Sequence, residues 1–396
     1  MNVVILYLVT FLESVGTGIL QRGTYFYTHE RLGFGQLTNL SLALAYGAAY
    51  VAGAFASHAA ATKWGERRLL TATLVALLVV HGAMAFAPGP RVLAMAFVIS
   101  ATLRGLKWPL FETYVSAGRT PREILSAVGK YNVSWALAMP VAVGVAGPLI
   151  SSPWPFLLFA LPAAINAISL ALVPAFPARP VHLDHAHPER PAALELARYR
   201  DLLFSARWSL LASYGLLFLL APLMPEIFDR IGVGIELATP AASLYDVTRV
   251  TSFVVLGRTG SSWRGRAAPL AVSALLLPLG FFGVLFAPSL LAALIGEVVL
   301  GGAAGFVYTA SLSYALVVKN ASVDAGGAHE GLIGLGLGLG PLAGIVGYSL
   351  SGQRLAMGSP LSYVEAMLVA VLPLVCLCMA GSLWPMPRLF RAASSA

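Results

Sequence analysis

The chain has 396 residues, of which 58% are hydrophobic and 11% are charged, and its mean hydropathy is +0.80. A soluble domain carries about 25% charged residues, so this composition excludes a soluble globular protein and indicates a membrane protein. The net charge of +8 is spread over many short loops, so we expect no nucleic-acid partner.

Twelve stretches are apolar and long enough to cross a bilayer, which takes about 20 residues. They lie at roughly 2–21, 37–58, 68–87, 92–115, 128–149, 154–174, 208–228, 239–257, 267–287, 290–317, 330–350 and 361–385. No small-residue cleavage site follows the first stretch, so we interpret it as a span and not as a signal peptide. The sequence therefore predicts an all-α, multi-pass integral membrane protein.

The Lys and Arg residues predict the orientation of these spans. If both termini are cytoplasmic, 17 of the 25 basic residues fall in cytoplasmic loops and tails, 5 fall in outer loops and 3 lie within spans. This bias follows the positive-inside rule and requires an even number of spans. We expect both termini in the cytoplasm and the chain in the inner (plasma) membrane of a bacterium. Arg22 counts here as an outer-loop residue.

A long interior connection at 176–206 divides the chain into an N-terminal bundle at 1–175 and a C-terminal bundle at 207–396. Its first part contains "HLDHAH" (182–187), which has the chemistry of a metal ligand set but is more typical of a solvated linker. Its second part, "ELARYRDLLFSAR", predicts an amphipathic helix on the cytoplasmic face. Cys376 and Cys378 lie in an apolar span, so we expect no disulfide, no metal and no other cofactor.

Ionisable residues inside spans are costly, so they mark functional positions or ion pairs. The candidates are Glu13, Arg104, Lys107, Glu112, Asp246, Arg249, Glu297, His329 and Glu330. Arg104 either faces a transport cavity or forms an ion pair, with Glu13 as the candidate partner, that only holds helices together. Glu13 and Glu297 are candidates for proton coupling or for permanent counter-ions. Asp246 and Arg249 are three residues apart on one helix, so we expect them to touch.

A second group of residues lies closer to the predicted cytoplasmic ends of the spans. Lys107 and Glu112 form either a cytoplasmic gate or a structural network, while His329 and Glu330 close the cytoplasmic side, sense protons or begin a helix. The run "GLGLGLGPLAG" that follows has no strand before it, so it indicates close helix packing and not a phosphate loop. The neutral candidates for solute contact are Trp108, Tyr131, Asn132, Tyr214 and Tyr308.

Two pairs of motifs repeat at about half the chain length, which is typical of transporters built from parallel halves. They are Gly147-Pro148 with Gly340-Pro341, 193 residues apart, and the loops around Gly65 and Gly265, 200 residues apart. With these repeats and its central loop, the chain resembles a divergent member of the major facilitator superfamily. The family's loop signature Gly-x-x-x-Asp-Arg-x-Gly-Arg-Arg is incomplete, because Thr62 stands at the Asp position.

The resemblance implies twelve helices in two pseudo-symmetric six-helix bundles, with spans one, four, seven and ten around a central cavity. We therefore expect a monomeric secondary active transporter that moves a small polar or amphiphilic solute across the lipid bilayer by alternating access. The mixed charges favour an anionic or zwitterionic solute, whereas the Gly-Pro signatures favour an exporting antiporter. Proton or ion coupling and uniport both stay open.

The alternative is a non-transporting receptor or assembly subunit on the same fold. It predicts an occluded cavity whose charges neutralise one another. An enzyme is not expected, because no nucleophile–base or metal constellation stands at a workable spacing.

Overall fold

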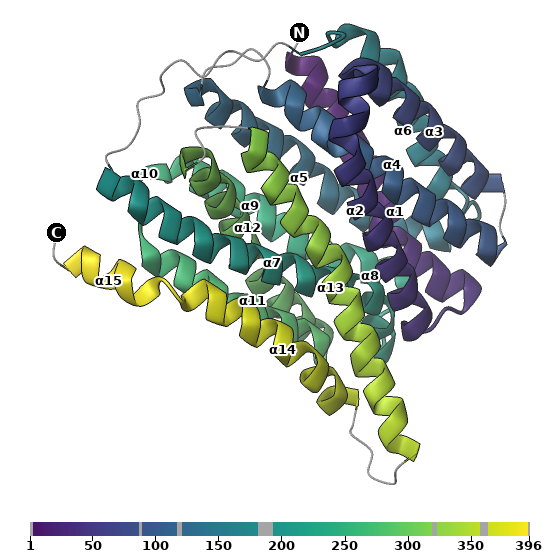
Figure 1. The fold of residues 1–396 in the computed structure, drawn as a ribbon. Helices are drawn as coiled ribbons and strands as arrows, with labels where there is room; N and C mark the ends of the chain where they lie inside the picture. Colours follow the sequence, from purple (N-terminus) through teal and green to yellow (C-terminus); the bar gives the residue numbers. More distant parts are fainter. Residues whose placement is uncertain are drawn as a thin grey trace.

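The computed structural model describes residues 3–86, 89–116, 121–180, 193–318, 323–356 and 363–394, and within these ranges the chain is helical without any strand (Figure 1). The helices are α1 (Val3–Leu32), α2 (Gln36–Trp64), α3 (Glu66–Phe86), α4 (Pro90–Ser116), α5 (Pro121–Ser151), α6 (Leu157–Leu172), η1 (Val173–Ala175), α7 (Ala193–Arg230), α8 (Ile235–Ala242), α9 (Leu244–Arg258), α10 (Gly260–Trp263), α11 (Ala267–Leu285), α12 (Leu290–Val318), α13 (Val323–Ala356), α14 (Tyr363–Leu383) and α15 (Met386–Ser394).

Eleven of these helices are long and apolar enough to cross a membrane. The predicted eighth span is divided, because α8 and α9 meet at Ser243. There the Ser243 hydroxyl donates to the Pro240 carbonyl (2.6 Å) and so competes with the helical hydrogen bonds. Counted as one span, α8 and α9 complete the twelve spans that the sequence predicts.

Two boundaries differ from the sequence prediction. Helix α1 continues to Leu32, so Arg22 is a buried residue inside a helix and not part of an outer loop. The segment predicted as a separate surface helix is the beginning of α7, where Leu202 is buried and the Ser205 hydroxyl donates to the Ser382 carbonyl (2.6 Å). The apolar face of this segment thus packs inside the protein. The "HLDHAH" run lies outside the described residues.

The two halves repeat one another in backbone conformation as well as in sequence. Gly33 (φ 66°) and Gly65 (φ 83°) follow α1 and α2, and Gly232 (φ 73°) and Gly265 (φ 73°) stand at the matching places of the second half. Positive φ favours glycine because it has no Cβ. The same chain reversals therefore recur at half-chain spacing, as expected for two pseudo-symmetric bundles.

We call the end of the bundle that holds the α1–α2 and α7–α8 loops the far side. The opposite side, where α6 ends and α7 begins, is the linker side. On the far half of the interface, α2 packs on α13 and α5 packs on α8. At Gly47 a Cβ would lie within 3.0 Å of the Gly338 nitrogen, so only glycine permits this approach of α2 and α13.

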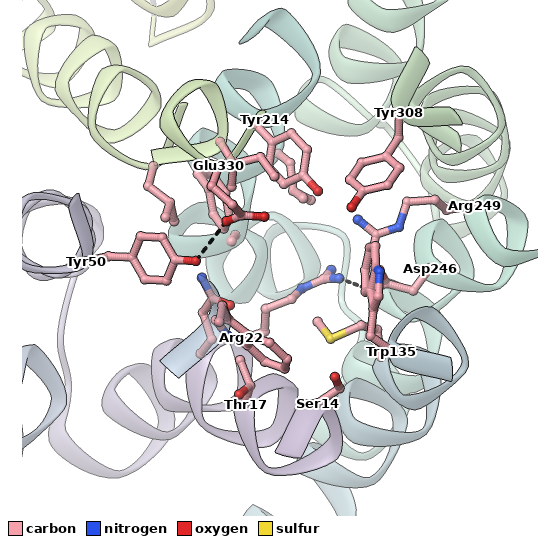
Figure 2. Close-up of a pocket in the computed structure, with 18 of the residues that line it drawn as sticks. Ser14, Thr17, Arg22, Tyr50, Trp135, Tyr214, Asp246, Arg249, Tyr308 and Glu330 are labelled. Atoms are coloured by element: carbon pink, nitrogen blue, oxygen red, sulfur yellow. Dashed lines mark hydrogen bonds and ion pairs between the residues drawn. The ribbon is translucent and has the colours of Figure 1, made fainter. Parts of the chain in front are cut away.

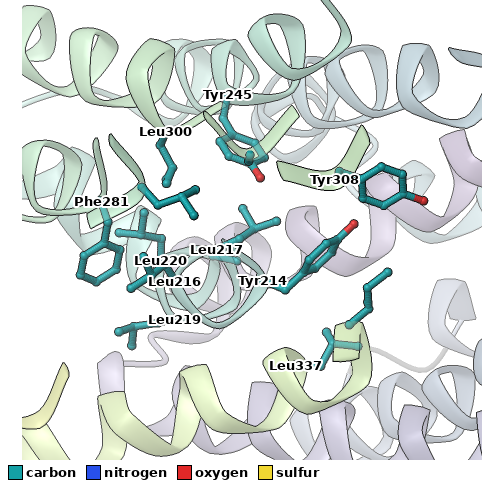
Figure 3. Packing of buried hydrophobic residues seen from close by; sticks show 14 of the residues in the cluster. Tyr214, Leu216, Leu217, Leu219, Leu220, Tyr245, Phe281, Leu300, Tyr308 and Leu337 are labelled. Atoms are coloured by element: carbon teal, nitrogen blue, oxygen red, sulfur yellow. The ribbon is translucent and has the colours of Figure 1, made fainter. Parts of the chain in front are cut away.

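Helix α7 is the most enclosed of the membrane-crossing helices described. Figure 3 shows Leu216, Leu219 and Leu220 of α7 facing Phe281 and Leu300, while Tyr214 lies toward Tyr308. The apolar side of α7 thus packs inside the C-terminal bundle. The opposite side of α7, which carries Tyr214, faces a space between the two halves.

Candidate functional site

A central cavity of about 130 Å³ lies between the two halves. Both halves contribute to its wall, through α1, α2, α4 and α5 on one side and α7, α9, α12 and α13 on the other. The lining residues include Trp135 and the residues that the sequence singled out as Trp108, Glu112, Tyr131, Tyr214, Asp246, Arg249, Tyr308 and Glu330. Arg22 and Tyr50 also line the cavity, and the sequence did not single them out. The wall therefore uses more helices than the four expected.

An ion cluster joins the halves toward the far side of the cavity. Arg22 of α1 reaches across and forms an ion pair with Asp246 of α9 (Figure 2), and it also donates to the carbonyl of Ala242 (3.1 Å). Arg249 binds the other oxygen of Asp246 at 2.8 Å, the expected i,i+3 contact. One buried carboxylate thus holds two guanidinium groups, one from each half.

Aromatic rings surround the solute space next to this cluster. The Arg249 guanidinium lies 4.9 Å from the Trp135 ring centroid, and the Trp135 ring packs edge-on against Tyr308 at 5.5 Å. Tyr214 follows, 6.4 Å from Tyr308. Figure 2 shows these side chains around one space. The cavity wall is therefore rich in aromatic rings and holds its two arginines in ion pairs.

Two carboxyl groups from opposite halves form another part of the cavity wall. They belong to Glu112 of α4 and Glu330 of α13. The Tyr50 hydroxyl of α2 donates to Glu330 Oε2 at 3.1 Å (Figure 2). This hydrogen bond therefore joins α2 of one half to α13 of the other.

Glu13 and Lys107 lie deeper, inside the N-terminal bundle. Lys107 Nζ binds Glu13 Oε2 at 2.6 Å, and each side chain is at most 2% exposed. The Asn166 amide donates to both Glu13 oxygens (3.1 and 3.0 Å), and its own oxygen lies 2.7 Å from His81 Nδ1. The partner of Glu13 is thus Lys107, one helical turn from the Arg104 that the sequence suggested.

Arg104 stands behind the cavity wall. It is 1% exposed, and its Nη1 donates to the hydroxyl of Tyr46 (3.0 Å), which itself lines the cavity. Its Nη2 has no hydrogen-bond partner among the described residues. The Arg104 guanidinium is thus linked to the solute space by the hydroxyl group of Tyr46.

Three further residues that the sequence singled out do not line the cavity but contact residues or helices that do. Asn132 accepts a hydrogen bond from Trp135 Nε1 (3.0 Å). Glu297 accepts from the backbone nitrogen of Tyr245 (2.7 Å), at the start of α9. The buried His329 ring packs edge-on against Tyr308 at 4.7 Å. Each supports a side chain or helix that forms the cavity.

A sequence profile of the Major Facilitator Superfamily matches residues 6–345. The chain belongs to this superfamily. Accordingly, this Major Facilitator Superfamily member is an integral multi-pass membrane protein and a secondary transporter of small molecules, and not an enzyme.

Solved structures show the same fold at low identity. The nucleoside transporter NupG is 15% identical over 98% of this chain and 99% of its own, with a TM-score of 0.67. A bacterial homologue of the human lysosomal transporter Spinster, in an inward-facing and unoccupied conformation, is 14% identical over 98% and 93%, with a TM-score of 0.69. A D-xylose–proton symporter is 14% identical over 95% and 96%, with a TM-score of 0.66. No curated protein sequence matches the chain.

Proposed function

We propose that this transporter moves a small polar or amphiphilic solute through the central cavity by alternating access, driven by a proton gradient. The observation that carries the proposal is the cavity itself, whose wall is built from both halves and combines aromatic rings with charged groups. A solute bound there contacts both halves, so rocking of one half against the other exposes it to either side in turn.

The Arg22–Asp246–Arg249 cluster holds the two halves together on the far side during one part of this cycle. Arg22 lies on the N-terminal half, whereas Asp246 and Arg249 lie on the C-terminal half. Opening the far side separates Arg22 from Asp246, so the ion pair is made in one conformation and broken in the other. Ion pairs of this kind give a bundle two discrete arrangements.

The receptor alternative predicts mutually neutralised charges, and the ion pairs at Asp246 and Glu13 fit that expectation. It also predicts an occluded cavity, whereas the cavity here is partly open to the outside of the protein. The open space favours transport.

The test is solute-driven proton movement in proteoliposomes that contain a pH-sensitive dye, across a broad panel of metabolites and amphiphiles. We expect at least one solute to move protons, and Arg249→Ala to lower that rate at least tenfold, because Asp246 then loses a partner beside the solute. Arg258→Ala is the matched control, since Arg258 lies at the exposed end of the same helix. The proposal would be contradicted if no solute of the panel moved protons and none accumulated inside the proteoliposomes.

A further inference from the structure

A groove of about 460 Å³ lies between α11 and α12, and none of the residues that line it lines the central cavity. At Gly280 and Gly296 a Cβ would meet the backbone of the facing helix, so only glycine permits the close crossing of α11 and α12. Beside this crossing, Leu279 is 64% exposed and Ile295 is 56% exposed. The groove therefore opens on the outer surface of the C-terminal bundle, toward the lipid.

The groove has the depth of one membrane leaflet. It begins at Pro288, in the far-side loop between α11 and α12, and reaches Leu276. From Phe286 to Leu276, α11 rises about 15 Å at 1.5 Å per residue. The hydrocarbon core of a bilayer is about 30 Å thick, so one leaflet supplies about 15 Å. An acyl chain of a far-side lipid thus has the length and the chemistry to lie in the groove.

An arginine stands at the far-side end of this groove. Arg230 Nη2 donates to the carbonyl of Leu285 (2.7 Å), the last residue of α11, and the next residue, Phe286, lines the groove. Arg230 is exposed, as is Asp229 before it. A guanidinium group is well suited to bind phosphate. Because Asp229 carries the opposite charge, we expect recognition of the phosphate group itself and not of a net negative headgroup.

We propose that the α11–α12 groove binds one phospholipid of the far-side leaflet, with an acyl chain over Gly283 and the phosphate at Arg230. Gly283 is exposed and lines the groove, and a Cβ there would make only an ordinary contact with Gly296 Cα at 3.4 Å. A larger side chain at this position would thus occupy the lipid's space without disturbing the helix crossing. The site lies apart from the central cavity, so the inference goes beyond the proposed transport.

Photo-crosslinking of the full chain in proteoliposomes tests the site. The probe is a phosphatidylcholine with a diazirine in its acyl chain, and peptide mass spectrometry locates the labelled residues. We expect α11 and α12 to be labelled about fivefold more than α3, because a recessed groove holds a chain longer than an open helix face does. Diacylglycerol with the same diazirine chain should label the groove about fivefold less, because it has no phosphate for Arg230.

Two variants fill the groove from opposite helices. Gly283→Leu on α11 and Ile295→Trp on α12 should each lower the labelling of the groove to the level of α3. Gly82→Leu is the matched control on α3, where a Cβ would meet nothing within 4 Å. Labelling that persists in both filled variants, or equal labelling of all lipid-exposed helices, would overturn the proposal. Cross-linked dimers that Gly283→Leu abolishes would also overturn it, in favour of a second copy of the chain.

A second pair of variants tests the phosphate contact. Arg230→Gln should remove the difference between phosphatidylcholine and diacylglycerol, because the amide carries no charge. Arg91→Gln, at an exposed far-side arginine of α4, should leave that difference unchanged. A difference that persists in Arg230→Gln would overturn the assignment of Arg230. Solute transport is measured separately, so loss of the lipid site would leave the proposed function standing.

Discussion

The Glu13–Lys107 ion pair shows what single residues contribute inside the N-terminal bundle. Taking two charges out of water is expensive, and their attraction offsets the cost only when geometry and further hydrogen bonds are good. Here the pair is 2.6 Å apart and Asn166 donates to both Glu13 oxygens. The pair therefore holds α1, α4 and α6 together, and it lies behind the solute space.

Lys107→Met should destabilise the protein by about 3–5 kcal/mol, because Glu13 is left buried without its counter-ion. The double variant Glu13→Gln/Lys107→Met should recover most of this loss, since the Gln oxygen still accepts from Asn166. Thermal unfolding midpoints in detergent compare the two. Equal midpoints for the single and double variants would show that the pair contributes no specific stability.

Sequence reasoning found the charged residues but not all of their partners. Asp246 and Arg249 were predictable because i,i+3 spacing fixes their contact. The pairing of Arg22 with Asp246 could not be predicted from the sequence, because the two residues are 224 positions apart. In addition, α1 continues past the length that a bilayer requires, so Arg22 does not lie in a loop. Likewise, helix packing and not sequence spacing decides whether Lys107 or Arg104 meets Glu13.

At the scale of elements, the far-side contact of α5 with α8 depends on Gly147. Its backbone nitrogen donates to Thr239 Oγ1 (2.7 Å), and a Cβ there would lie 3.2 Å from the Ile235 carbonyl carbon and closer still to its oxygen. The Gly-Pro motif that indicated an antiporter signature thus also has a packing role between the halves.

Gly147→Ala should loosen α8 from α5, because the added methyl group meets rigid backbone. Hydrogen–deuterium exchange should then rise several-fold in the peptide that covers Ile235–Ala242. Gly144→Ala is the control one turn earlier, where a Cβ would meet only Ser243 Oγ at 3.8 Å. Unchanged exchange in α8, or an equal rise in both variants, would argue against this packing role.

The boundaries of helices were predictable where a long apolar stretch ends at polar, Gly or Pro residues. The twelve spans and the repeated loops at Gly65 and Gly265 follow from hydropathy and composition. The break at Ser243 could not be predicted from hydropathy, because it arises from a local side-chain hydrogen bond within an otherwise continuous apolar stretch.

At the scale of the whole molecule, contacts around Arg22, Gly147 and Gly47 join the two halves on the far side. Alternating access requires a second arrangement in which these contacts separate. Asp246→Asn should favour that arrangement. It removes the carboxylate between Arg22 and Arg249, so two positive charges from opposite halves repel one another.

Pulsed electron–electron distance measurements test this rocking most directly, with Cys376 and Cys378 first replaced by Ser. One spin-label pair replaces the exposed Leu37 and Leu237 on the far side, and the other replaces Trp64 and Arg258 on the linker side. We predict that Asp246→Asn lengthens the far-side distance and shortens the linker-side distance. Two unchanged distances, or two that change in the same direction, would contradict alternating access about this cavity.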